Sequence, residues 1–140
     1  MPTALSLLRE GKTPKALYVG LFLDERSHAA LIRWVRDDGP VFPKVYAHHV
    51  TIQFKPTPEE LASLPIGEPA SVRVIGYAFD SKAQAVVVDG LKVLTGATPH
   101  VTVATAEGVS PAYSKELLAN GYGTVRGPVL TGTIQVEYGK

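Results

Sequence analysis

The sequence predicts a single domain of the α+β class in which short strands outnumber helices. Its 140 residues fit one compact domain with a sizeable core, and no linker divides them. Thirteen glycines and eleven prolines imply many turns, which favours short strands over a helix bundle. Apolar, β-branched runs alternate with segments that carry helix-capping signals, so both kinds of element are expected.

The chain is expected to begin with an N-terminal extension over residues 1–15. Residues 16–23 are apolar throughout and predict a central strand. Asp24 can cap the following helix, whose apolar face runs through residues 29–35 and which ends at an Asp-Asp-Gly-Pro run. His28 is expected on the surface of this helix.

A second strand is predicted over residues 45–54. The run Thr57-Pro58-Glu59-Glu60 has the form of a capping box with proline at the first helical position, so a short helix is expected to reach about Leu64. Strands over residues 71–79 and 83–88 follow, and the Asp-Ser-Lys segment between them predicts a hairpin turn.

The last part of the chain repeats the pattern of strand and short helix. A strand is predicted over residues 101–105, and Ser110-Pro111 opens a helix that ends near Asn120-Gly121. Residues 129–138 form the closing strand. In both halves a strand is therefore followed by a short helix that opens with proline.

The most informative feature of the chain is a pair of His-x-Thr triplets, each within one of these strands. Because side chains alternate along a strand, His49 and Thr51 share one face, and His100 and Thr102 do the same in the second strand. The apolar neighbours point the other way, into a core: Val50, Ile52 and Phe54 in the first strand, and Val101 and Val103 in the second. His48 falls on the face opposite His49, which excludes it from a shared role. The alternative is that both histidines merely lie at the rim of a sheet.

Composition limits the kinds of function. The chain has no cysteine, which excludes disulfides, thiolate metal sites and cysteine nucleophiles. The net charge is +1, with acids and bases interspersed, so no basic stripe indicates binding along a nucleic acid. The first residues are too few and too charged for a signal peptide or membrane span. We expect a cytoplasmic monomer whose ligand is a small anion or the end of an RNA.

The two triplets resemble the defining motifs of the 2H phosphoesterase, or LigT-like, superfamily, which are two His-x-Thr/Ser motifs with hydrophobic flanks. The resemblance runs from the strand around Tyr18 to the closing strand, and residues 108–114 also resemble the cyclic-phosphodiesterase domains of RNA-repair enzymes. It implies a bilobal α+β fold. Two pseudo-symmetric antiparallel sheets with outer helices would line a central cleft that receives one histidine from each side.

Two histidines suit the cleavage of a cyclic phosphodiester, which needs a base for the attacking oxygen and an acid for the departing one. Imidazole can serve as either near neutral pH. The hydroxyl groups of Thr51 and Thr102 would contact the non-bridging phosphate oxygens. This scheme requires no metal or other cofactor, and the sequence does not assign acid and base between His49 and His100.

Four other residues are candidates for binding the substrate. Tyr18 and Tyr113 are candidates for stacking on a nucleobase, although core packing or plain exposure is an equal alternative for each. Lys115 and Lys55 are candidates for phosphate contacts, although lysines are usually solvated. The helix opening at Ser110 would point backbone N–H groups at a phosphate, or would simply be an ordinary capped helix.

The sequence therefore predicts a metal-independent cyclic phosphodiesterase of the 2H type. Its substrate would be a 2′,3′-cyclic phosphate on an RNA 3′ end or a nucleotide, or a 3′,5′-linked cyclic oligonucleotide signal of the kind cleaved by phage enzymes that blunt bacterial immunity. One alternative is a non-catalytic module that binds nucleotides or RNA ends in the same cleft. Another is a structural β-domain with incidental histidines. No protein partner is indicated.

Overall fold

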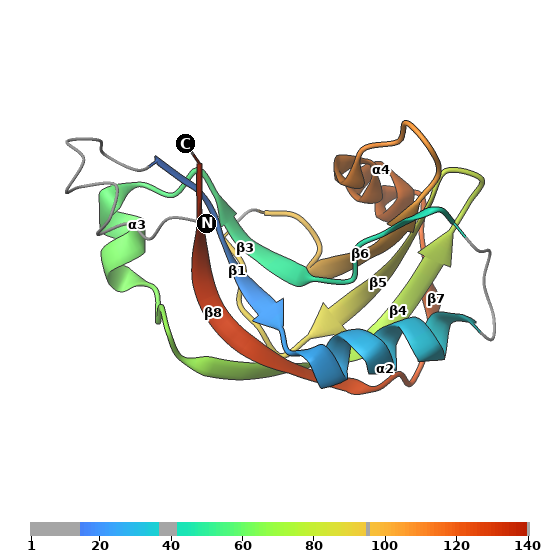
Figure 1. Ribbon diagram of the computed structural model, residues 1–140, viewed down its shortest axis with the longest axis horizontal. Helices are drawn as coiled ribbons and strands as arrows, with labels where there is room; N and C mark the ends of the chain where they lie inside the picture. Colours follow the sequence, from blue (N-terminus) through green and yellow to red (C-terminus); the bar gives the residue numbers. More distant parts are fainter. Residues whose placement is uncertain (1–14, 37–41, 95, 140) are drawn as a thin grey trace.

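The protein is a strongly bent antiparallel sheet with one helix packed against its core and short helices toward its ends (Figure 1). The computed structural model describes residues 15–36, 42–94 and 96–139. Along the chain the elements are β1 (Lys15–Leu23), α2 (Glu25–Arg36), β2 (Lys44–Val45), β3 (His49–Phe54), α3 (Pro58–Ser63), β4 (Pro69–Phe79), β5 (Ala83–Asp89), β6 (His100–Thr105), η1 (Pro111–Tyr113), α4 (Ser114–Ala119), β7 (Gly123–Thr124) and β8 (Val129–Gly139). The predicted α+β class is confirmed.

Within the described ranges the strands form one eight-stranded sheet in the order β2-β6-β3-β1-β8-β4-β5, with β7 paired to β4. The pairings between these strands are antiparallel. A further pairing joins β5, the last strand of this order, to β6, so that β6, β3, β1, β8, β4 and β5 close into a ring. The seam between β3 and β6 is short, with Val50 opposite Val101.

The core consists of the apolar residues that point to one side of these six strands. Val19 on β1, Val50 on β3, Val101 on β6 and Leu130 on β8 are all fully buried in it. Helix α2 adds Leu31 to the same cluster. Since side chains alternate along a strand, the residues between these positions lie on the opposite face of the sheet. That opposite face holds both His-x-Thr motifs.

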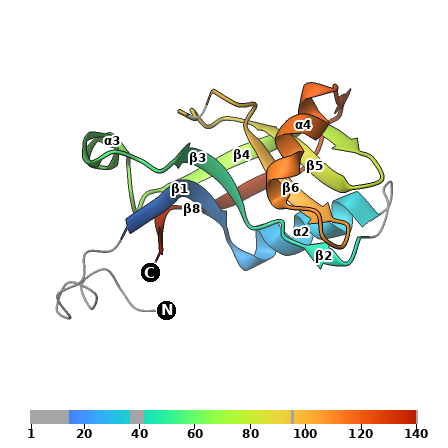
Figure 2. The same cartoon turned by 90° about the horizontal axis from the view of Figure 1, so that it is seen from above.

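The helices begin at the caps that the sequence indicates. The backbone N–H of Ser27 donates to Asp24 Oδ1 at 2.8 Å at the start of α2. Thr57 and Glu60 form both hydrogen bonds of a capping box on α3. Helix α4 packs Leu117 and Leu118 against β5 and β4, and seen from above it lies at the opposite end of the sheet from α3 (Figure 2). No helix among the described residues is both long and apolar enough to cross a membrane.

Most predicted elements are confirmed within one or two residues, including the turn in which Asp80 Oδ1 accepts from the N–H groups of Lys82 and Ala83. The predicted helix after Ser110 is a 3-10 turn followed by α4. The N-terminal extension, apart from Lys15 at the start of β1, and the Asp-Asp-Gly-Pro run lie outside the described residues.

The predicted strand over 45–54 is wrong in one respect, because residues 46–48 interrupt it between β2 and β3. Lys44 lies opposite Thr105 and Val50 lies opposite Val101, so this strand must fit two more residues than β6 into the same span. Ala47 takes up the excess with a left-handed backbone, φ 56°. His49 therefore stands directly after a break.

Candidate active site

The two motifs meet where β3 crosses β6. Val50 and Val101, the central residues of the triplets, lie opposite each other and are fully buried. The histidine and threonine of each motif consequently lie on the other side of the sheet, together with alternate residues of the neighbouring strand β1. We call this surface the histidine face. It comprises Tyr18, Phe22, His49, Thr51, His100 and Thr102.

The antiparallel register crosses the two motifs. With Val50 opposite Val101 and the chains running in opposite directions, His49 stands on the side of Thr102, and Thr51 stands on the side of His100. Each histidine thus stands opposite the threonine of the other motif.

His49 is held mainly by aromatic rings. Its ring centroid lies 4.7 Å from that of Tyr18 and 5.4 Å from that of Phe22, in stacked geometry. Both rings come from β1, where Phe22 lies opposite His49 in register. Gly20, between them, makes this packing possible, because a β-carbon there would lie 2.8 Å from the Val50 carbonyl oxygen and 3.4 Å from His49 Cδ2.

The break before His49 is fixed by hydrogen bonds on both sides. The N–H of Ala47 donates to the carbonyl oxygen of Thr102 at 2.9 Å, and His28 Nδ1 donates to the carbonyl oxygen of Ala47 at 2.8 Å. His28 also stacks on His48, with ring centroids 5.4 Å apart. The expectation that His28 is simply a surface residue is therefore wrong: it is half-buried and supports the segment that leads into His49.

Burial changes the titration of both histidines on this face. Desolvation, together with the nearby positive charges of His48 and His100, lowers the pKa of His49 from 6.5 to about 4. Desolvation also lowers the pKa of His100, although the carbonyl oxygen of Thr98 acts in the opposite direction and Lys115 in the same one. Both imidazoles thus favour the neutral form near pH 7.

His100 is oriented by the backbone. Its Nδ1 lies 2.7 Å from the carbonyl oxygen of Thr98, a geometry in which Nδ1 carries the proton and donates it. Nε2 is then left for a ligand. A hollow of about 260 Å³ adjoins this ring and is lined in part by Ala97, Lys115 and Leu118.

The two threonines differ in what they contact. The Thr102 hydroxyl lies 2.8 Å from the hydroxyl of the fully buried Ser114 and 3.3 Å from the carbonyl oxygen of Pro111, so it ties β6 to the start of α4. The Thr51 hydroxyl makes no hydrogen bond to any described residue and is half-buried. Thr51 is therefore the motif hydroxyl that is free to bind a ligand.

Tyr18 lies on the histidine face and contacts His49, whereas Tyr113 contacts Asp80 and Lys82 instead. The Tyr18 ring packs on His49, and burial together with the charge of Glu137 raises the pKa of its phenol, which stays protonated. The Tyr113 hydroxyl donates to the Asp80 carboxylate, which raises the pKa of Tyr113, and Lys82 Nζ lies over its ring. Both tyrosines thus have structural partners.

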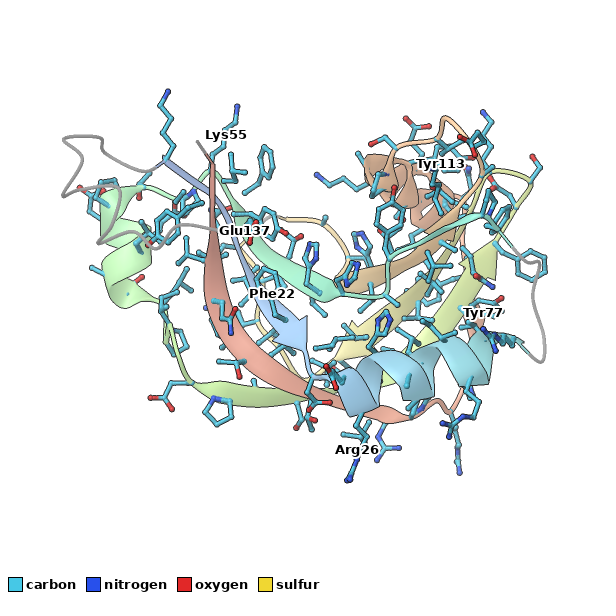
Figure 3. The ribbon with its side chains drawn as sticks, viewed as in Figure 1. Phe22, Arg26, Lys55, Tyr77, Tyr113 and Glu137 are labelled. Carbon is cyan, nitrogen blue, oxygen red and sulfur yellow. The ribbon has the colours of Figure 1, made fainter. Side chains whose placement is uncertain are left out.

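Figure 3 shows the arrangement of this surface. Phe22 and Glu137 lie toward the middle of the bent sheet, with Lys55 at the end near α3 and Tyr113 at the end near α4. Lys115 on α4 is exposed and close enough to influence His100. A second hollow, of about 800 Å³, adjoins Phe22 and runs along β8 and β4, past Thr133 and Ser71.

Sequence reasoning missed four contributors to this site: Phe22, Gly20, Glu137 and the Thr98 carbonyl group. Strand alternation starting from Tyr18 places Gly20 and Phe22 on the same face, so this signal was available. Glu137 and the Thr98 carbonyl group depend on strand pairing and loop geometry, for which the sequence carries no local signal. In the described part of the chain, no group of three or more His, Asp or Glu side chains is placed to hold a metal ion.

Comparison with known proteins adds no assignment. No protein-family model matches the chain, and no curated protein matches its sequence.

Proposed function

We propose that this chain is a cyclic phosphodiesterase of the 2H type. The observation that carries the proposal is the convergence of the two His-x-Thr motifs on one face. Strands β3 and β6 are adjacent, and His100 is close enough for its positive charge to lower the pKa of His49. Two oriented imidazoles beside a free hydroxyl suit general acid–base cleavage of a phosphodiester.

The different supports of the two histidines suggest different roles. His49, neutral near pH 7, would accept a proton from water as the water oxygen attacks phosphorus. His100 would donate a proton from Nε2 to the ribose oxygen as the phosphorus–oxygen bond breaks. Burial lowers the pKa of His100, so this role requires the negative charge of the bound phosphate to favour the imidazolium. The carbonyl oxygen of Thr98 acts in the same direction as the phosphate, because an imidazolium can still donate from Nδ1.

Thr51 would bind a non-bridging phosphate oxygen. Its hydroxyl makes no hydrogen bond within the described ranges and stands on the side of His100 in the register. A donor aimed at charge that develops on phosphate oxygens lowers the barrier to displacement. Thr102 would instead position β6 through Ser114.

The bilobal architecture of the superfamily is part of the same proposal. The short seam between β3 and β6 supports it, since it divides the bent sheet at the point where the two motifs meet. Within this chemistry the substrate would be a 2′,3′-cyclic phosphate on an RNA end or nucleotide, or a 3′,5′-linked cyclic oligonucleotide. Cleavage would proceed without a metal in a cytoplasmic monomer.

The test is turnover of 2′,3′-cyclic AMP and a panel of cyclic dinucleotides in the presence of EDTA, with products identified by mass and retention time. We expect turnover by the natural protein, and loss of at least 100-fold in kcat/KM for His49→Ala and for His100→Ala. His48→Ala serves as the matched control and should keep most of the activity. Tight binding without turnover would identify a binding module instead, and neither binding nor turnover would identify a structural domain.

A further inference from the structure

Phe54, at the end of the first motif strand, is the most exposed large apolar residue of the described chain. Its side chain is 58% exposed, so the expectation that Phe54 points into the core is wrong. The register of β3 against β1 shifts by one residue before Phe54, which interrupts the alternation counted from His49. An exposed phenyl ring beside a polar site is a frequent contact for a flat ligand, whereas scattered exposed leucines need no explanation. The question is whether Phe54 belongs to the surface that holds the histidines.

Strand pairing places it there. Phe54 lies opposite Tyr18 in the register of β3 and β1, and directly opposed residues share a face. Tyr18 in turn packs on His49, so the ring of Phe54 continues the histidine face toward the end near α3. In Figure 3 the neighbouring Lys55 stands at the rim of the bent sheet at that end.

The ring is also available to a ligand. Tyr18 and Phe22 use their rings to hold His49, as described above. No aromatic ring among the described residues stacks on Phe54; the contact to its ring is Lys55 Nζ, 5.7 Å from the centroid. The Phe54 ring thus does not hold another aromatic ring of this face in place.

Lys55 adds a fixed positive charge. Its backbone adopts φ 47°, a left-handed conformation that is costly for a lysine, and its N–H donates to the carbonyl oxygen of Leu17 at 2.8 Å. This hydrogen bond holds the turn that carries the ammonium group over the Phe54 ring. A planar group on the ring and an anion at Lys55 would be bound together.

The spacing from the histidines limits what that ligand can be. Phe54 lies opposite Tyr18 and His49 lies opposite Phe22, four residues further along β1, so at about 3.3 Å per residue the two positions are about 13 Å apart along the sheet. The base of the nucleotide whose phosphate lies at His49 is attached through one ribose and does not extend that far. A second nucleotide does.

We infer that the ligand is a strand whose last nucleotide carries the cyclic phosphate, and that Phe54 stacks on the base of the nucleotide before that one. Lys55 contacts the phosphate group that joins these two nucleotides. This inference rests on the proposed function and narrows it to an RNA 3′ end of at least two nucleotides. The extended path along β3 and the charge at its outer end favour a linear strand over a compact cyclic dinucleotide.

The test compares three substrates: 2′,3′-cyclic AMP, the dinucleotide ApA ending in a 2′,3′-cyclic phosphate, and cyclic 3′,5′-di-AMP. We expect Phe54→Ala to raise KM for the linear dinucleotide about tenfold with kcat nearly unchanged, and to leave 2′,3′-cyclic AMP unaffected. Lys55→Gln should weaken the salt dependence of the dinucleotide reaction. Phe79→Ala is the matched control, because Phe79 is 49% exposed on β4 and lies outside the histidine face.

The outcomes separate this inference from the proposed function. Equal effects of Phe54→Ala on the mononucleotide and the linear dinucleotide, or no effect on either, would overturn the inference while leaving the enzyme intact. A KM effect confined to cyclic di-AMP would refute the inference that the ligand is a linear RNA end.

If the natural protein turns over none of the three, binding of ApA with a 2′-phosphate decides the matter by calorimetry. Weaker binding to Phe54→Ala than to Phe79→Ala supports the contact without catalysis. Equal affinities, or no binding to the natural protein, refute it.

Discussion

The burial of His49 predicts that the protein loses stability in mild acid. Burial and two neighbouring histidines lower the pKa of His49 from 6.5 to about 4. The folded state therefore resists a proton that the unfolded chain takes up as the pH falls from 6.5 to 4. Stability from this source is fully present above pH 6.5 and is lost through that window.

The size of this loss of stability follows from the same shift in the pKa of His49. At about 1.36 kcal/mol for each pKa unit, the difference between 6.5 and about 4 amounts to about 3 kcal/mol in the free energy of unfolding. This is a large share of the stability of a typical domain, about 5–15 kcal/mol. It is an upper value, because water reaches part of the half-buried ring.

Urea unfolding of the natural protein and of His49→Gln, followed between pH 7 and pH 4, measures this quantity. His100, Asp24, Glu60 and Asp80 also have a lowered pKa in the folded state, and they destabilise both proteins alike in acid. The difference between the two curves therefore isolates His49. We expect the natural protein to lose up to about 3 kcal/mol more than the variant over this range.

His48→Gln is the control, since His48 is exposed and next in sequence. It should follow the natural protein closely, apart from the small contribution that His48 makes to the pKa of His49. Parallel curves for the natural protein and His49→Gln would refute the reasoning, because they would mean that His49 titrates alike in the folded and unfolded chain.

Two further predictions concern the residues around the histidines. Thr102→Val should cost about 1–2 kcal/mol of stability, since it leaves the hydroxyl of buried Ser114 without its partner, whereas Thr51→Val should leave the urea midpoint nearly unchanged and lower kcat about 100-fold. The reverse pattern would show that the two hydroxyls have been assigned wrongly. Tyr18→Phe should retain activity within about twofold, whereas Tyr18→Ala should lose about tenfold because the His49 ring loses a stacking partner. Equal losses in both variants would instead assign a role to the phenol group.

Local signals were enough to predict most elements. Alternation separated His49 and His100 from the buried valines, and capping residues marked the start of α2 and α3. These predictions succeed because each depends on residues within one turn or one strand.

The remaining features depend on distant parts of the chain. The break at Ala47 arises because β2 and β3 must fit two more residues than β6 into the same span, which only the pairing with β6 reveals. The role of His28 depends on a hydrogen bond to that break. The closure of the sheet by β5 and β6 likewise has no counterpart in local periodicity.

The two motifs are alike in sequence, but the structure supports them by different means. His100 is fixed by a carbonyl group that accepts a hydrogen bond from Nδ1 in both charge states of the ring, so its orientation persists when Nε2 gains or loses a proton. His49 is fixed by stacked rings and has no hydrogen-bond partner in the described part of the chain, so its surroundings oppose a positive charge. Burial opposes a positive charge on His100 as well, but there the Thr98 carbonyl group acts against the effect of burial. The proposed cleavage needs one base and one acid, and this inequality supports that part of the proposal, because two identical environments would give both imidazoles the same preference. Under that proposal, the asymmetry around the motifs, rather than their repetition, would give the proton transfer its direction.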